Sequence, residues 1–315
     1  MAGLLLAVTD VDVLDALVPA AGGLIGVEVG RLRGVAAAEK VLERVHQMRG
    51  RGTKEDGRPR FLLGVRKPLY LLGGEPCPAV MSSDDARRQR AYEDLEAFLA
   101  EAGAFGADYV VFGFPWPPVL RRPDEPPWRL DGVEPLVAHS AAATEERAAA
   151  FFAWASRLAA SGAPAMFVAN SGPNPHVFRS QLYPDLLRRH PAVGFCLDIA
   201  TLHLHAAAGF VDAGRFVEAM APLTGLVRVG NSRLCGKDGQ KMPALPELRP
   251  GHGWADVPAL LSAVIAASPG CRVTFDAGSD MPPARQAVAL RWVREMVESR
   301  RGRDGGSAID RWVKG

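Results

Sequence analysis

The chain has 315 residues, of which 48% are hydrophobic and 23% are charged, and its formal net charge is +2. This balance is typical of a soluble globular protein, and the charge is too small to favour nucleic acid or an anionic membrane surface as a partner. No apolar run approaches the roughly 20 residues that a membrane-spanning helix needs, and the first residues lack a basic leader with a cleavage site. We therefore expect a cytoplasmic protein that acts on a small molecule, with a homodimer as a possible assembly.

Short, continuously apolar runs alternate eight times with longer amphipathic stretches. Runs of this kind are typical of parallel strands that are buried on both faces. The predicted strands cover residues 3–10, 24–30, 60–66, 107–115, 164–170, 193–200, 225–231 and 271–278. The clearest predicted helices cover residues 35–48, 84–104, 144–160, 211–222, 256–267 and 283–300.

Eight strands, each followed by a helical connection, predict an α/β fold with a single (β/α)8 TIM barrel and long βα loops. The predicted barrel covers residues 1–302, and the Gly-rich, charged segment 303–315 is predicted to be a flexible tail. A doubly wound open sheet is the alternative, although it would have to leave two sheet edges.

Three connections after predicted strands are longer than simple turns require: residues 67–83, 115–143 and 232–255. Long loops in compact domains are usually functional or disordered. The second of them is rich in proline and carries Trp116. Because proline stiffens a loop, we predict a shaped wall at the barrel mouth; solvated surface decoration is the alternative.

Three predicted strands end on polar or charged residues, namely Asp198, Arg228 with Asn231, and Asp276. Active sites of α/β barrels lie at the carboxyl ends of the strands. Asp198, Arg228 and Asp276 are therefore the predicted catalytic residues.

The order of the segments resembles the xylose isomerase-like TIM barrel superfamily, which includes sugar phosphate isomerases and epimerases and endonuclease IV. The resemblance is spread over most of residues 3–298 and is sharpest in three pieces. GVRKPLYLLG (64–73) is similar to a strand-three VHxPYxxN element, and VGFCLDIATLHLHAAAG (193–209) is similar to vgxxlDtxHxxxaG. RPGHGWADVPALL (249–261) is similar to a glycine-rich PLGxGxID segment.

The resemblance implies a divalent cation at the barrel mouth, held by Glu, Asp, His or Gln, and Glu at the ends of strands five to eight. The matching positions here are Asn170, Asp198, Arg228 and Asp276, so only the Asp of strand six is unchanged. Histidines that endonuclease IV uses for further metals are matched by Arg66, Phe114 and Thr201. A guanidinium has no lone pair to offer a metal, so this site is a degenerate version of the superfamily's metal site.

Three functional hypotheses remain open. In the first, the guanidinium of Arg228 fills the place of the ion between Asp198 and Asp276, and the protein is a cofactor-free isomerase, epimerase or lyase. Such an enzyme would act by proton transfer on a polar, anionic or sugar-like substrate. In the second, Mn, Mg or Zn binds through Asp198, Asp276, Asn170 and His203, and the protein is a metal-dependent sugar (phosphate) isomerase or epimerase. In the third, the barrel is a non-catalytic binding or scaffold protein.

Further polar and aromatic residues near the predicted mouth are candidates for substrate contact. They are Glu28, Arg66, Trp116, Asn170, His176, Asn231, Arg233, Arg249 and His252. Glu28 lies in the middle of the second predicted strand; if it points inward, it needs a cation or a raised pKa. His203 and His205 alternate with leucines, so they are alternatively packing residues.

Overall fold

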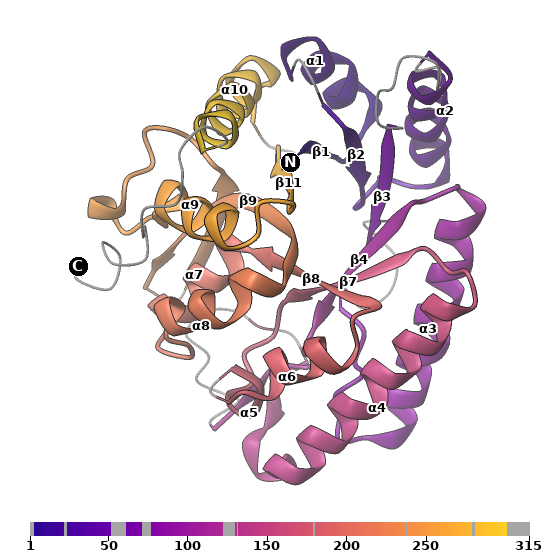
Figure 1. The fold of residues 1–315 in the computed structure, drawn as a ribbon, viewed down its shortest axis with the longest axis vertical. Helices are drawn as coiled ribbons and strands as arrows, with labels where there is room; N and C mark the ends of the chain where they lie inside the picture. The colour runs from indigo at the N-terminus through magenta and orange to yellow at the C-terminus, as the bar shows by residue number, and fades with distance from the viewer. Residues whose placement is uncertain are drawn as a thin grey trace.

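The computed structural model describes residues 3–21, 24–51, 61–70, 77–121, 130, 132–178, 180–236, 238–278 and 281–300. Eight parallel strands form a closed barrel (Figure 1). They are β1 (Leu4–Val8), β2 (Gly26–Val29), β3 (Leu62–Arg66), β4 (Tyr109–Phe114), β7 (Ala165–Asn170), β8 (Val193–Asp198), β9 (Thr224–Cys235) and β11 (Arg272–Asp276). The pairing of β8 with β9 closes the ring, which confirms the barrel and rules out the open sheet.

Helices follow the strands and surround the barrel (Figure 1). They are α1 (Val11–Ala21), α2 (Val35–Arg51), α3 (Asp85–Ala104), α4 (Ala141–Ala160), α5 (Pro175–Phe178), α6 (Leu182–Arg189), α7 (Ile199–Ala207), α8 (Ala213–Met220), α9 (Val257–Ala267) and α10 (Pro283–Arg300). Single 3-10 turns occur at η2 (Leu136–Ala138), η3 (Ala221–Leu223) and η4 (Pro250–His252). The six predicted helices are all present. Helix α7 begins at the residue after β8 because the Asp198 side chain accepts a hydrogen bond from the Thr201 amide and caps it.

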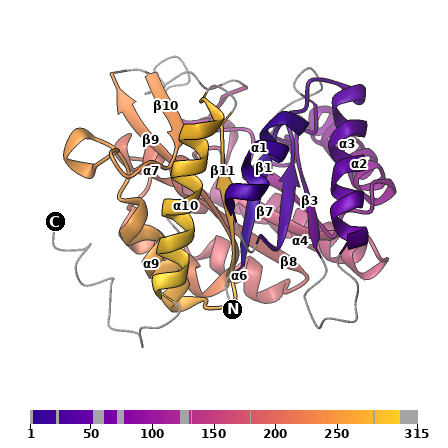
Figure 2. The ribbon, with the colours of Figure 1, turned by 90° about the horizontal axis from the view of Figure 1, so that it is seen from above.

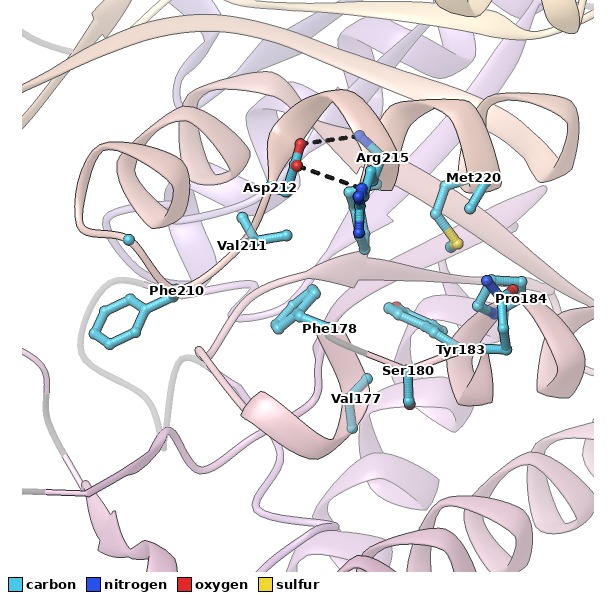
Figure 3. A pocket seen from close by; sticks show the side chains of 14 residues that line it. Val177, Phe178, Ser180, Tyr183, Pro184, Phe210, Val211, Asp212, Arg215 and Met220 are labelled. Carbon is cyan, nitrogen blue, oxygen red and sulfur yellow. Dashed lines mark hydrogen bonds and ion pairs between the residues drawn. The ribbon is translucent and has the colours of Figure 1, made fainter.

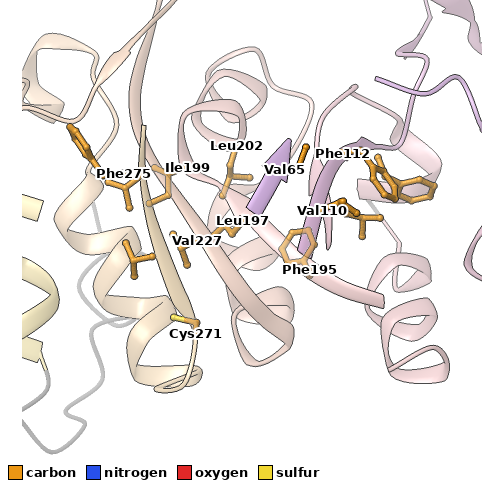
Figure 4. Packing of buried hydrophobic residues seen from close by; sticks show 14 of the residues in the cluster. Val65, Val110, Phe112, Phe195, Leu197, Ile199, Leu202, Val227, Cys271 and Phe275 are labelled. Atoms are coloured by element: carbon orange, nitrogen blue, oxygen red, sulfur yellow. The ribbon is translucent and has the colours of Figure 1, made fainter. Parts of the chain in front are cut away.

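Alternate residues of each strand face opposite sides of the barrel wall. Outward-facing residues such as Val65, Leu197, Val227 and Phe275 pack against the helices in one large hydrophobic cluster (Figure 4). A smaller inner cluster fills the lower part of the barrel and consists of Leu5, Tyr109, Val111, Cys196 and Leu226. The continuously apolar strand sequences therefore follow from burial on both faces.

The connection from 232 to 255 was predicted to be a long loop, and this prediction is wrong for its first half. Strand β9 continues to Cys235 and pairs antiparallel with β10 (Asp238–Pro243). The two strands extend together at one end of the barrel, at the top of Figure 2. The first four residues of β10 are exposed, so this segment lacks the apolar run from which the other strands were recognised.

The described part of the proline-rich connection is fixed to the preceding loop through Glu134. This residue lies in β6 (Glu134–Pro135), which pairs with β5 (Val119–Leu120). Its carboxylate accepts hydrogen bonds from the Ser83 amide (2.8 Å), the Ser83 hydroxyl (2.7 Å) and Ser82, and it lies 2.8 Å from Nε2 of His139. Burial raises the pKa of Glu134, but the hydrogen bonds from His139, Ser82 and Ser83 outweigh that effect and hold it below the ordinary value. These contacts support the prediction of a shaped wall.

The predicted tail at 303–315 lies outside the described residues, as do 71–76 and 122–129 of the first two long connections. Among the helices that the structure describes, none combines the length and the apolar character needed to cross a bilayer.

We expect Glu134→Ala to lower the free energy of unfolding by about 2 kcal/mol, because it leaves several buried donors without their charged acceptor. Urea denaturation followed by circular dichroism measures the change. Glu145→Ala is the matched control, since Glu145 is an exposed residue of helix α4. Equal losses in the two variants would contradict the anchoring role of Glu134.

Candidate functional site

The charged residues at the barrel mouth share the inward-facing positions of their strands. On β9, Leu226 packs in the inner cluster, while Val227 and Val229 pack outward, so Arg228 faces inward. The same alternation turns Asp276, Asp198, Glu28 and Arg66 inward on their strands. The alternation of side chains along each strand and the closure of the barrel thus bring five ionisable groups together at the mouth of the barrel.

Arg228 is buried, with 3% of its surface exposed, and it forms two ion pairs. Its Nη2 contacts Oε1 of Glu28 and its Nη1 lies 3.4 Å from Oδ2 of Asp276. The prediction that Asp198 and Asp276 hold the guanidinium together is correct for Asp276. It is wrong for Asp198, because a second carboxylate from inside the barrel, Glu28, takes that role.

Glu28 points into the barrel and is 1% exposed. Its Oε2 lies 3.5 Å from the hydroxyl of Tyr109, whose ring crosses the interior in the space left by Gly64. A Cβ on Gly64 would lie 2.1 Å from that ring, so only glycine fits there. The cation that a buried Glu28 requires is Arg228, which answers the question that the sequence left open.

Asp276 and Asp198 differ in their partners. Asp276 has a side chain that is 35% exposed, and it lies between Arg228 and Arg66, whose Nη1 is 3.8 Å from Oδ2. Asp198 accepts a hydrogen bond from the Thr201 amide at 2.8 Å through one carboxylate oxygen. Within the described chain it has no ion pair. The carboxylate of Asp198 is therefore the less engaged of the two.

Two cavities of about 500 and 470 Å³ open at the mouth. The first is bounded by β10 and the start of α10, and the second by β4, β7 and the loop that carries Trp116. Both are lined by Arg31, Arg66, Asp198, Arg228 and Lys241. They are neighbouring halves of one concave site over the inward-facing charges.

Two residues predicted to contact substrate, Asn170 and Asn231, face outward from the barrel wall, and their side chains form hydrogen bonds with the backbone. The side chain of Asn170 accepts a hydrogen bond from the backbone N–H of Asp198 at 2.8 Å through Oδ1. Its Nδ2 donates a hydrogen bond to the backbone carbonyl of Asp198 at 3.1 Å. Oδ1 of Asn231 accepts from the Ser232 and Ala255 amides. Each lies one residue beyond an inward-facing position, Ala169 or Gly230, and this explains the difference. Asn170 still borders the second cavity, and Asn231 lies away from both.

Four other predicted contact residues line neither mouth cavity. Arg233 lies over the Trp254 ring at 4.8 Å, and His176 places Nε2 2.9 Å from the His139 carbonyl. Arg249 and His252 are exposed on the loop after the hairpin. Of the predicted contact residues, Arg66, Trp116 and Asn170 line the cavities, with Glu28 beneath them.

The sequence did not single out Arg31 and Lys241, which line both halves of the mouth. Arg31 lies two residues after the end of β2, and its φ of 58° is in the left-handed region that non-glycine residues rarely adopt. Lys241 belongs to β10, where its Nζ lies 2.6 Å from the Thr201 hydroxyl. The sequence could have indicated Arg31, because this residue lies close to a strand end. The position of Lys241 at the mouth depends on the β9–β10 hairpin, which was not predicted.

A larger cavity, of about 740 Å³, lies outside the barrel between α5, α6 and α8. Figure 3 shows Phe178, Tyr183 and Met220 around it, with the pair Asp212 and Arg215 at one side. None of the inward-facing charges reaches it. We therefore assign the functional site to the mouth.

The side chains at the mouth do not fit the divalent cation that the resemblance implies. Arg228 occupies the strand-seven position and brings a permanent positive charge within 3.4 Å of Asp276. Asn170 is engaged by backbone, and Nδ1 of His203 lies 3.1 Å from the Ser232 hydroxyl. In the described part of the chain, no three His, Cys, Asp or Glu residues are grouped so that they could hold a metal ion.

Comparison with solved structures identifies the fold. An L-ribulose 3-epimerase aligns over 96% of both chains with a TM-score of 0.58 and 15% identity. The probable 3-DHS dehydratase AsbF of Bacillus anthracis covers 93% of this chain and 99% of its own, with a TM-score of 0.56 and 10% identity. A xylose isomerase-like TIM barrel protein of Mycobacterium smegmatis in complex with magnesium covers 92% and 87%, with a TM-score of 0.51 and 12% identity.

The chain has the xylose isomerase-like TIM barrel fold. No family profile and no curated protein matches its sequence. At such low identity the likeness to these solved structures extends to the fold alone, and the activity has to be argued from the site.

We expect Glu28→Gln to destabilise this xylose isomerase-like barrel by about 3 kcal/mol, because it leaves a buried guanidinium without its inner counter-charge. Thermal and urea unfolding measure the loss, with Glu145→Gln on the surface as control. The double variant Glu28→Leu/Arg228→Met removes both charges and should recover much of the stability. A single variant as stable as the wild type would contradict the pairing.

Burial and, secondarily, the charge of Lys241 lower the pKa of His205 to about 3. Unfolded, the group titrates near 6.5, so the unfolded state binds the proton first as the pH falls. We expect the stability that depends on His205 to be intact above pH 6.5 and to be lost between pH 6.5 and about 3. In urea titrations across this window, His205→Gln should show a shallower decline than the wild type; parallel curves would contradict this assignment.

Proposed function

We propose that the protein is an enzyme of the isomerase, epimerase or lyase type that acts by proton transfer on a polar, sugar-like or anionic substrate without a catalytic metal. The observation that carries this proposal is the buried guanidinium of Arg228 at the floor of the mouth. It is held between Glu28 and Asp276 at the position where the resemblance implies a metal ligand.

A fixed cation can do the electrostatic work that such chemistry requires. Removing a proton next to a carbonyl or hydroxyl group leaves negative charge on oxygen, which a preorganised donor in a poorly solvated cleft stabilises. Arg228 has five N–H donors, and its two ion pairs leave others for a substrate oxygen. Because Glu28 and Asp276 hold it, the guanidinium does not need to reorganise during the reaction.

We assign the proton transfer to Asp198. It lines both halves of the mouth and, among the described residues, has no cationic partner. Asp276 lies beside two guanidinium groups, so we assign it the role of positioning Arg228 and Arg66. The names of the structural neighbours, an epimerase and a dehydratase among them, support a reaction of the epimerase or lyase type.

The proposal is tested by incubating the protein in D2O with a panel of aldoses, ketoses, their phosphates and hydroxy acids, with a chelator present. Mass spectrometry then detects deuterium at carbon. We expect exchange into at least one substrate, and a loss of about 100-fold or more in Asp198→Asn and in Arg228→Met. Asp185→Asn, an exposed residue of α6, is the control and should keep full activity.

Two outcomes would contradict this function. Exchange that is abolished by the chelator and restored by manganese, magnesium or zinc would show the metal-dependent reaction. Absence of exchange with every compound, together with mouth variants that alter nothing measurable, would favour a non-catalytic binding barrel.

A further inference from the structure

We propose that Arg31, Arg66 and Lys241 form a binding site for an oxyanion group, a carboxylate or a phosphate, on the molecule that enters the mouth. This inference deepens the proposed function and rests on it, because the proposed function assigns where the reactive end of the substrate lies. The three cations come from three separate elements, and each lines both halves of the mouth. They surround the rim, whereas Arg228 lies at the floor.

The balance of charge at the mouth leaves these three side chains available. Six basic residues line the two cavities: Arg31, Arg66, Lys67, Arg228, Lys241 and Arg285. Lys67 is paired with Asp94 at 2.5 Å, and Arg285 with Glu247 at 2.5 Å. Arg228 is held by its two carboxylates.

Arg31 and Lys241 have no acidic partner within the described chain. Arg66 has only a distant one, Asp276 at 3.8 Å. Among the described residues, Arg31 and Lys241 are therefore cations at the rim without an acidic partner of their own, and Arg66 is only weakly paired.

The three side chains border the same two cavities, and each is positioned by a neighbouring segment. Arg31 donates its backbone N–H to the Pro68 carbonyl at 2.9 Å, which fixes the end of β2 to the residues after β3. A Cβ on Gly30 would lie 3.5 Å from Nε of Arg66, so the Arg66 side chain runs along the segment that carries Arg31. Lys241 approaches from β10, where Thr201 fixes its amine.

The backbone at Arg31 supports a binding role independently. Its φ of 58° makes it the one non-glycine residue with positive φ in the described part of the chain. A turn that needed only this conformation would favour glycine. Strained residues of this kind are retained where the side chain has a function, and here the side chain is a cation at the mouth.

Two arginines and a lysine suit an oxyanion group better than a neutral sugar. Arginine binds the oxygens of carboxylates and phosphates through paired, charge-assisted hydrogen bonds, and lysine adds a mobile point charge. An anion at the rim would orient the remainder of the molecule toward Asp198 and Arg228. The inferred substrate is therefore a small polar compound with a carboxylate or a phosphate at one end.

Isothermal titration calorimetry at low ionic strength tests the site, with inorganic phosphate in one arm and malonate in the other. We expect saturable binding of at least one probe, and the stronger one identifies the preferred group. Binding should weaken about tenfold or more in Arg31→Gly and in Lys241→Gln and should fall as salt is added. Arg215→Gln, exposed on α8, is the control and should bind as the wild type does.

Arg31→Gly also separates loss of binding from loss of folding. Because glycine relieves the left-handed strain, this variant should melt at or above the wild-type temperature while binding the probe more weakly. Absence of binding in the wild type at millimolar probe, or unchanged affinity in both variants, would overturn the inference.

Phosphate binding needs no turnover, so this result stands apart from the deuterium exchange experiment. If the probe binds and no exchange is found, the proposed reaction fails and the anion site remains.

Discussion

The ion pair between Glu28 and Arg228 is the interaction on which the mouth of this barrel depends. Both side chains are almost fully buried, and both come from inward-facing positions of strands that are not neighbours in the sheet. Burial of either charge alone would cost several kcal/mol, so the two are stable only together. The pair fixes the guanidinium, and the guanidinium in turn fixes Asp276 at the rim.

The ion pair places a guanidinium group at the floor of the mouth. A solved structure with the same fold is described in complex with magnesium, a bound dication. Here Arg228, a side chain of the protein itself, brings a positive charge to the floor of the mouth. A guanidinium stabilises charge by directional hydrogen bonds, so the position of a substrate oxygen is restricted to the free N–H directions. Under the proposed function, the cations at the rim would anchor the substrate and the carboxylate of Asp198 would transfer the proton.

The sequence predicted the architecture well because its strongest signal is burial. Eight continuously apolar runs marked the eight barrel strands, and polar residues at their ends marked the mouth. A strand end alone does not say which face a residue occupies, and this is why the outward orientation of Asn170 and Asn231 was not predicted. Alternation counted from the apolar neighbours, as with Leu226 and Arg228, would have separated these two asparagines from the inward-facing residues.

The β9–β10 hairpin is polar and half-exposed, so neither the hairpin nor the position of Lys241 could be predicted from hydrophobic periodicity. The partner of Arg228 also required the closed barrel, because Glu28 lies some 200 residues earlier in the chain.

The central claim is that a guanidinium, and not a metal ion, provides the positive charge at the floor of the mouth. The most direct measurement is anomalous diffraction from crystals grown with manganese or zinc, collected at the absorption edge of the metal. The account predicts no anomalous peak between Asp198 and Asp276, and guanidinium density between Glu28 and Asp276. An ordered anomalous peak at that position, with Arg228 displaced from Glu28, would contradict it.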